Sequence, residues 1–374
     1  MFINSEFDGG NIRCLSCDDP ANIELEIRND KDSDFYQWFY FRAAGVEAVP
    51  CTFKIKNAAG AAYPKGWQDY RAVASYDREF WFRVDTDFDG ETLSIRHTPQ
   101  YNSVYYAYFA PYTMERHADL IADAIDSPLV GTEVLGLTLD GQAMDLLTVG
   151  EAGAGKKVCW VIARQHPGET MAEWWMEGFL ERLLDESDPV AREVLKKACF
   201  YIVPNMNPDG SKRGHLRTNA VGANLNREWT DASLERSPEV FLVRKKMHET
   251  GVNLSLDVHG DESLPYNFIA GTHGIASWSP QRQVLLEKYK SELMRANPDF
   301  QTTHGYPLNK PGTGNLGMCS NYVGETFGAL AMTLEMPFKD TVDWPDEDQG
   351  WSPERCRKLG YANLDAIYAV LDEV

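Results

Sequence analysis

His166 and Glu169 are the residues whose types and spacing most directly suggest chemistry. They lie shortly after the apolar run VCWVIA, and Pro167 and Gly168 between them form a turn that lets both side chains face one point. His259 follows a second apolar run, LSLDV, and would complete a set of two histidines and one glutamate. Catalytic zinc usually takes three protein ligands and keeps a fourth position for water. Each histidine alone could be a structural residue at a strand end, so the combination is what predicts a metal site.

A second group of polar residues lies elsewhere in the chain. Glu335 ends the apolar run ALAMTLE, where an ionised carboxylate is costly unless it has a partner or a function. The segment 205–229 concentrates basic side chains in a chain whose net charge is −20. These charges could belong to a solvated turn, or they could bind a carboxylate and a developing oxyanion, which the planar guanidinium of arginine suits. The basic residues of the segment are Lys212, Arg213, His215, Arg217 and Arg227.

The elements that must position these side chains alternate between strands and helices from residue 134 onward. Apolar runs predict strands at 156–163, 199–204, 253–260 and 329–337. Amphipathic runs predict helices at 170–186, 237–251, 281–296 and 353–374. This alternation predicts an α/β fold in which a mixed or parallel sheet is covered by helices on both faces. Ligands of such sheets bind beyond the carboxyl ends of the strands, where His166, His259 and Glu335 fall.

The first part of the chain has a different pattern. Short runs rich in aromatic and β-branched residues predict strands at 35–43, 51–57, 79–87, 91–97 and 103–113. No helical pattern separates them, which favours an antiparallel β-sandwich. The pattern changes near residue 116, so we expect an N-terminal domain over 1–115 and a second domain over 116–374. The aromatic run 38–41 is expected to pack in the core and at interfaces rather than to bind a ligand. The aromatic residues of 35–41 and 101–112 could pack between domains or between the subunits of a homo-oligomer.

The composition argues against several classes of function. A net charge of −20 disfavours general nucleic-acid binding and binding to an anionic membrane surface. The first residues have no signal-peptide pattern, and no apolar run approaches the ~18 residues of a membrane-spanning helix. The seven cysteines are odd in number and scattered, which predicts a cytoplasmic protein rather than a disulfide framework. Cys14 and Cys17 form a CxxC pair without the second pair that a zinc knuckle needs.

The residues above occur in motifs that resemble those of the M14 zinc carboxypeptidases, and more closely those of the cytosolic carboxypeptidase branch. In the family's order the chain has HPGE (166–169), NPDG (207–210), NLNREW (224–229), DVHG (257–260), GTG (312–314) and TLEMP (333–337). QWFYFR (37–42) and YFAPYT (108–113) are similar to motifs of that branch's N-terminal β-sandwich. The resemblance therefore spans nearly the whole chain. Each motif alone is common, whereas the ordered set is specific.

The resemblance implies a carboxypeptidase-like fold and one Zn²⁺ ion per chain. The implied zinc ligands are His166, Glu169 and His259. Glu335 matches the catalytic base of the family, which activates water. Arg217 matches the arginine that polarises the scissile carbonyl.

The resemblance also implies the residues that bind substrate. Asn226 and Arg227 match the pair that grips the terminal carboxylate. Tyr322 matches the family's mobile tyrosine, because it lies a similar distance before the catalytic glutamate. Gly168 stands where the digestive branch has an arginine. Asn315 stands where eukaryotic cytosolic members often have an arginine after GTG, which argues against a preference for acidic terminal residues.

These expectations describe a metallocarboxypeptidase that hydrolyses the C-terminal peptide bond, or a glutamyl side-chain bond, of a peptide or protein. A zinc amidohydrolase acting on small N-acyl amino acids would use similar zinc ligands and a carboxylate-binding arginine. A third hypothesis is an inactive binding module whose sandwich domain binds a partner. The NLNREW motif and the N-terminal sandwich favour the peptidase. The substrate could be a protein tail, a branched glutamate or a cell-wall peptide.

Overall fold

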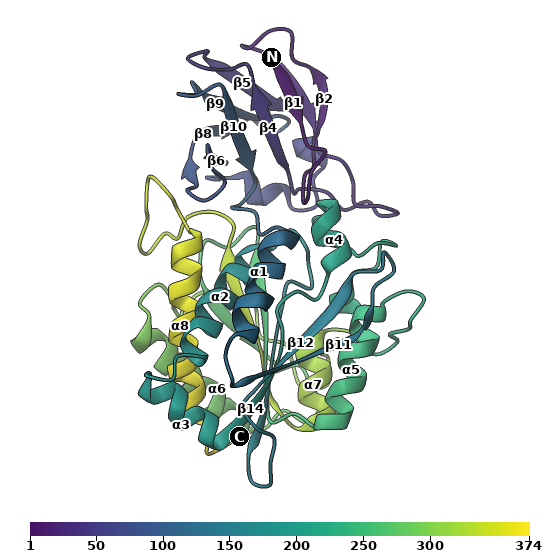
Figure 1. Ribbon diagram of the computed structural model, residues 1–374, viewed down its shortest axis with the longest axis vertical. Coiled ribbons are helices and arrows are strands. Elements are labelled where there is room, and N and C mark those ends of the chain that lie inside the picture. The colour runs from purple at the N-terminus through teal and green to yellow at the C-terminus, as the bar shows by residue number, and fades with distance from the viewer.

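The computed structural model describes residues 1–374, which form two regions stacked along the long axis of the molecule (Figure 1). The upper region holds strands β1 to β10, and the lower region holds a larger sheet with its helices (Figure 1). The segment between β10 (Ser103–Ala107) and α1 (Met114–Ile125) connects them.

The larger sheet has seven strands in the order β11-β12-β14-β13-β15-β17-β16. Strands β14, β13, β15 and β17 run parallel, and the outer strands pair in the antiparallel sense. The strand bounds are β11 (Val130–Leu137), β12 (Ala143–Val149), β13 (Lys157–Ala163), β14 (Ala198–Val203), β15 (Leu254–Asp261), β16 (Phe268–Gly271) and β17 (Leu330–Pro337). Three parallel neighbours, β13, β15 and β17, therefore end at the same edge of the sheet.

Helices cover both faces of this sheet (Figure 1). One layer consists of α2 (Met171–Leu183), α3 (Pro189–Lys197), α6 (Pro280–Ala296) and α8 (Pro353–Val370), and the other of α5 (Pro238–Thr250) and α7 (Cys319–Phe327). The short helix α4 (Pro208–Arg213) follows β14. Side chains of β13 alternate between the two layers: Cys159 and Val161 pack on one side, and Trp160 and Ile162 on the other. Because β13 is buried on both faces, its sequence does not alternate between polar and apolar residues.

The N-terminal region is a sandwich of two five-stranded sheets, β1-β4-β10-β6-β7 and β2-β3-β5-β9-β8. Its elements are β1 (Phe2–Asn4), β2 (Arg13–Ser16), β3 (Ile23–Glu26), β4 (Tyr40–Ala44), β5 (Cys51–Ile55), η1 (Ala58–Gly60), η2 (Pro64–Trp67), β6 (Val73–Ser75), β7 (Phe82–Arg83), β8 (Asp85–Phe88), β9 (Leu93–His97) and β10. The sheets pack face to face, since the ring of Phe53 lies 5.6 Å from that of Phe41 and 4.7 Å from that of Tyr106. Only β3 and β5 pair in parallel.

The predicted fold class is confirmed, with local differences. The run 35–43 is a strand only from Tyr40, although Trp38 and Phe39 are also buried, as expected for core residues. Strands β11 and β12 were not predicted individually, and β11 is largely exposed. The short helices α3, α4 and α7 were also not predicted. These elements lie outside the long runs of periodic apolar residues from which secondary structure can be predicted.

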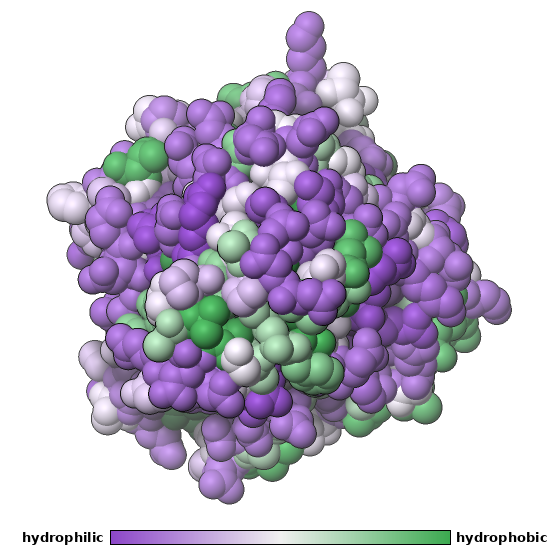
Figure 2. Space-filling view, turned by 90° about the horizontal axis from the view of Figure 1, so that it is seen from above, coloured by the Kyte–Doolittle hydropathy of each residue, from purple (hydrophilic) through white to green (hydrophobic).

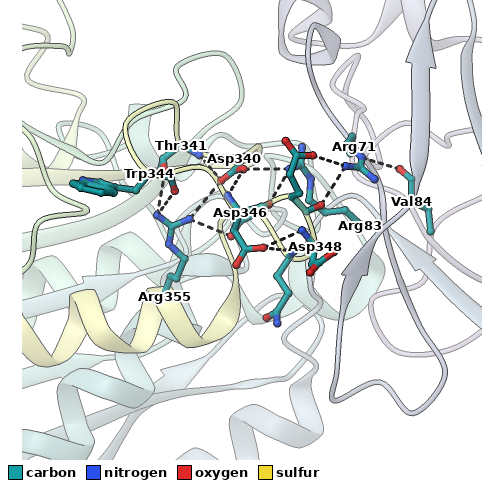
Figure 3. A network of polar contacts seen from close by, with 12 residues as sticks. Arg71, Arg83, Val84, Asp340, Thr341, Trp344, Asp346, Asp348 and Arg355 are labelled. Atoms are coloured by element: carbon teal, nitrogen blue, oxygen red, sulfur yellow. Dashed lines mark hydrogen bonds and ion pairs between the residues drawn. The ribbon is translucent and has the colours of Figure 1, made fainter.

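A polar network joins the loop after β17 to the sandwich (Figure 3). Arg83 on β7 pairs with Asp340 at 3.2 Å, and both side chains are largely buried. The backbone N–H of Arg83 donates to the carbonyl of Asp348 at 2.7 Å. Arg355 on α8 contacts the same Asp340 from the other side at 3.4 Å. The sandwich therefore stabilises the loop that follows Glu335.

The surface seen from above is mostly hydrophilic, with apolar residues gathered in one region below the centre (Figure 2). None of the helices combines the length and the apolarity that crossing a bilayer requires. All seven cysteines are free thiols, and five of them are buried. The cysteines therefore add no covalent cross-link to the fold.

Candidate active site

His166, Glu169 and His259 converge at the carboxyl ends of β13 and β15, and all three are buried. The carboxylate of Glu169 lies between the two imidazoles, with Oε1 2.6 Å from Nδ1 of His166 and Oε2 2.7 Å from Nδ1 of His259. The two Nδ1 atoms are 3.2 Å apart. Two nitrogen ligands held at ~2.1 Å by one tetrahedral zinc ion lie about 3.4 Å apart. The three donors therefore fit a single zinc ion.

Two of these three side chains already have the protonation state that a zinc ligand needs. Burial and the nearby guanidinium of Arg217 lower the pKa of His166 to about 3, so its imidazole is neutral near pH 7. Burial raises the pKa of Glu169, but the facing histidines outweigh it and hold this pKa below its usual range. Burial lowers the pKa of His259, whereas the carboxylates of Asp257 and Glu169 raise it well above its usual value. Metal binding here would displace the proton of His259.

Two further side chains orient the histidines. Oδ2 of Asp257 lies 2.9 Å from Nε2 of His259, and Oδ1 of Asn224 lies 3.1 Å from Nε2 of His166. Partners of this kind fix the ring orientation at zinc sites, which leaves each Nδ1 toward the metal. Sequence reasoning assigned neither role. Asp257 did carry a signal, because a residue two positions before His259 on a strand lies on the same face.

The turn that presents the first two ligands depends on Arg164, which sequence reasoning also missed. Its φ is 59°, in the left-handed region that costs a non-glycine residue about 1–2 kcal/mol. Its buried guanidinium offsets this cost by donating to the carbonyls of Pro167 at 2.9 Å and Tyr112 at 2.7 Å. It also pairs with the buried carboxylate of Glu173. Arg164 therefore holds the backbone that leads into His166.

Glu335 lies on β17 directly beside His259 on β15, since the two are register partners. Its side chain is 7% exposed, and Oε2 has no hydrogen-bond partner in the protein. Burial raises the pKa of Glu335 well above its usual value, and the nearby His259 offsets this only in part. The residue lines a cleft of about 400 Å³ that also includes Asn226. A buried, unpaired carboxylate beside a metal site and facing a cleft is a candidate for proton transfer.

Arg217 faces the same centre from the loop after α4. Burial lowers the pKa of its guanidinium, but the nearby Tyr63, together with the carboxylates of the surrounding glutamates, outweighs burial, so the pKa is raised. These glutamates are Glu262, Glu169 and Glu335. The loop also packs on the metal-binding turn: the N–H of Gly168 donates to the carbonyl of Leu216 at 2.9 Å. A Cβ at position 168 would lie only 2.9 Å from that oxygen, so this turn requires glycine.

Asn226 and Arg227 lie on η3 (Leu225–Arg227), which is tied to the metal site through Asn224. Oδ1 of Asn224 accepts the N–H of Asn226 at 3.1 Å and contacts His166. Oδ1 of Asn226 accepts the N–H of Cys319 at 2.9 Å. Partial burial and the proximity of Arg217 lower the pKa of Arg227, so these two cations are neighbours. Of these predicted residues, Asn226 and Glu335 line the cleft, and Arg217 and Arg227 lie next to them.

Tyr322 is not brought into this cleft. It lies on α7 with its hydroxyl 2.8 Å from Nε2 of His248 and its ring 6.0 Å from that of Trp229. The tyrosine that lines the cleft is Tyr306, in the irregular segment between α6 and α7. Its hydroxyl donates to Oδ2 of Asp261 at 2.6 Å. The residue is 45% exposed, but desolvation of its hydroxyl and the nearby carboxylate of Glu335 raise its pKa. Tyr306 is therefore a protonated donor at the rim of the site.

A buried glutamate on α5 supports the segment that carries η3. The carboxylate of Glu239 accepts from Nδ2 of Asn219 at 3.3 Å, and Oδ1 of Asn219 accepts the N–H of Ala223 at 3.0 Å. Burial raises the pKa of Glu239 from 4.5 to about 8. A carboxyl with a raised folded-state pKa contributes stability below its unfolded pKa, and this stability is lost as the pH rises through the folded value.

We therefore expect the free energy of unfolding to fall as the pH rises from about 4.5 to about 8. Glu239→Gln should flatten this dependence and raise Tm relative to the native chain at pH 8, since each pKa unit corresponds to about 1.4 kcal/mol. Thermal unfolding at several pH values measures the effect. The exposed Glu235→Gln is the matched control. A Glu239→Gln effect that is the same at every pH would contradict the prediction.

Comparison with known proteins agrees with this site. Residues 3–109 match the cytosolic carboxypeptidase N-terminal domain, and residues 115–341 match the zinc carboxypeptidase family. The structure of a metallo-carboxypeptidase from Burkholderia cenocepacia is 49% identical, with a TM-score of 0.97 over 99% of both chains. A metallo-carboxypeptidase from Pseudomonas aeruginosa, solved in complex with (2-guanidinoethylmercapto)succinic acid, is 44% identical, with a TM-score of 0.98 over 100% of both chains.

Among curated relatives, Cytosolic carboxypeptidase 1 of Mus musculus is 29% identical over 283 residues. The match covers 64% of this chain and 23% of that protein, so the chain spans only part of this relative's length. The zinc carboxypeptidase match covers more than half of the chain and confirms the resemblance carried by the sequence motifs. The chain therefore belongs to the zinc carboxypeptidase family and is a metallocarboxypeptidase with Zn²⁺ as its cofactor.

Proposed function

We propose that this chain removes single residues from the C-termini of peptides or proteins. The observation that carries the proposal is the cleft that joins Asn226 to Glu335 beside the cluster of His166, Glu169 and His259. A terminal carboxylate held at Asn226 and Arg227 would bring the last peptide bond next to Glu335. That arrangement favours exopeptidase action, because a chain without a free carboxylate has no anchor there.

In the proposed mechanism each of these residues has a separate role. Zinc held by His166, Glu169 and His259 would lower the pKa of a water molecule to about 7 and polarise a carbonyl. Glu335 accepts the proton of the attacking water and then delivers it to the leaving amine. Arg217 donates hydrogen bonds to the oxyanion that develops on the scissile carbonyl.

We further propose that terminal residues without a negative charge are removed fastest. No arginine lines the cleft, and the lysine that lines it, Lys290, is 3.1 Å from the carboxylate of Glu287. Within the cleft lining, an acidic side chain would therefore meet no guanidinium besides those proposed to bind the terminal carboxylate and the oxyanion. The Pseudomonas aeruginosa relative was solved with a ligand that carries a guanidino group, which agrees with tolerance of a positive side chain.

We also propose that residues 1–115 and 116–374 are the two domains and that the enzyme works in the cytoplasm. The division is supported by β10, which ends at Ala107, and by α1, which begins at Met114. The compartment is supported by seven free cysteines, which a reducing environment preserves.

Digestion of a peptide library varied at its last two positions tests the proposal. Mass spectrometry should detect release of single C-terminal residues, with slow release of terminal Asp and Glu. N-acetylated single amino acids, assayed in parallel, should be poor substrates. Efficient hydrolysis of these small amides with no trimming of peptides would instead support the amidohydrolase. Zinc binding without hydrolysis of either class would support the binding module.

Arg227→Ala should lower kcat/KM for peptides with a free C-terminal carboxylate by about 10- to 100-fold, because a hydrogen bond to a charged group contributes about 1.5–3 kcal/mol. Amide-capped peptides should lose much less, since they offer no carboxylate. Kinetics on matched free and amidated peptides make the measurement. Arg213→Ala is the control, because that guanidinium pairs with Asp140 outside the cleft at 2.6 Å. Equal losses on both peptides would refute this role of Arg227.

A further inference from the structure

The N-terminal sandwich region holds one side of the loop that carries Arg217. The carboxylate of Asp30 accepts the N–H groups of Leu216 at 2.6 Å, Arg217 at 2.8 Å and Thr218 at 2.9 Å. It also accepts the hydroxyl of Thr218 at 3.0 Å. One side chain therefore bonds three successive backbone amides, with Arg217 in the middle.

Asp30 is unusual because it is 2% exposed and all four of these contacts are to uncharged groups. A buried carboxylate is costly unless its lone pairs are satisfied, and here the amides of the loop satisfy them. The backbone on both sides of Arg217 is thereby fixed. Neighbouring contacts extend this attachment, since Nδ2 of Asn11 donates to the carbonyl of Gly214 at 2.9 Å and the N–H of Lys31 lies 3.1 Å from Nε2 of His215.

The side chain of Arg217 is held by the same region. Its guanidinium carbon lies 5.7 Å from the ring centre of Phe35 and 5.4 Å from that of Tyr63. Both distances are within the range of cation–π attraction. The backbone of Tyr63 is itself fixed, because its N–H donates to Gln37 at 2.8 Å and its carbonyl accepts from Gln37 at 3.1 Å.

We infer that the N-terminal domain is a working part of the active site, in which Asp30 positions the backbone of Arg217 and Tyr63 positions its guanidinium toward the scissile carbonyl. This inference rests on the proposed function, in which Arg217 stabilises the oxyanion. Asp30 is a positioning residue, since it acts only through the loop. Stabilisation of developing charge depends on preorganised donors, and a misplacement of about 1 Å can cost about 100-fold in rate.

Asp30→Ala should therefore lower kcat by about 10- to 100-fold while KM and bound zinc stay near native values. Asp30 forms no hydrogen bond with the metal ligands or η3, so a change confined to kcat separates positioning from general damage. Asp34→Ala is the matched control, because Asp34 is an exposed acid in the same loop. Zinc content by mass spectrometry and steady-state kinetics are measured on each variant.

A double-mutant cycle gives the decisive readout. Once Arg217→Ala has removed the guanidinium, adding Asp30→Ala should have little further effect on kcat. Equal effects of Asp30→Ala in both backgrounds would overturn the inference, because the residue would then act on the whole fold. If Asp30→Ala keeps the native kcat while Arg217→Ala is slow, the inference is overturned but the role proposed for Arg217 stands. Native kcat in Arg217→Ala would overturn the role proposed for Arg217 and, with it, the inference. If Asp30→Ala does not fold, Tyr63→Leu enters the same cycle with the same expected outcomes.

Discussion

Glu335→Gln is expected to lower kcat by about two to four orders of magnitude while the fold and the bound zinc are retained. Glutamine has nearly the same shape as glutamate but accepts no proton at neutral pH. Oε2 of Glu335 bonds no protein group, so the substitution breaks no internal hydrogen bond at that atom. KM should change little, because the carboxylate of the substrate is held at Asn226 and Arg227.

Steady-state kinetics and zinc analysis on the purified variant check this expectation. Glu181→Gln makes the same chemical change at an exposed position of α2 and serves as the control. Turnover near the native rate in Glu335→Gln would exclude this residue as the base. Loss of zinc would show instead that the substitution disturbs the neighbouring His259.

Glu169→Ala is expected to abolish activity by removing the ligand that lies between the two histidines. Only His166 and His259 would remain to bind the ion. Substitutions of residues that merely orient zinc ligands cost about 10- to 100-fold in affinity or activity, so removal of a ligand should cost more. Asp257→Asn supplies the graded comparison, since Asp257 orients His259 from 2.9 Å.

Zinc titration of the chelator-treated proteins measures the two effects. The native enzyme should regain activity at the lowest zinc concentration, Asp257→Asn at a higher one, and Glu169→Ala at none. Recovery of Glu169→Ala at the same concentration as the native enzyme would remove Glu169 from the ligand set.

The central part of the site could be predicted because strand order controls it. The apolar runs before His166 and His259 and around Glu335 are recognisable as strands, and parallel strands in covered sheets present ligands at their carboxyl ends. β13, β15 and β17 are neighbours, so the three residues meet. Asn226 and Arg227 came from the family motif, and their approach to the cleft depends on Asn224.

The remaining part could not be predicted because it depends on contacts without a local pattern. The position of Tyr322 was inferred from its distance before Glu335, but its side chain turns toward His248. Tyr306 lies in a segment without periodicity, where distance along the chain does not predict direction. Asp30 and Tyr63 belong to a different domain from Arg217, and nothing in their own neighbourhoods indicates a partner so far along the sequence.

The attachment of Asp30 to Thr218 has a consequence for biosynthesis, because it spans 188 positions of the chain. Domains generally fold as units during synthesis, the N-terminal one first, and contacts between distant residues form late. The sandwich region would therefore emerge from the ribosome long before the loop that it holds, and Glu335 would follow more than a hundred residues after that loop. The enzyme is thus expected to gain activity only after Glu335 has been synthesised and the loop has docked on the sandwich, so shorter nascent chains should be inactive.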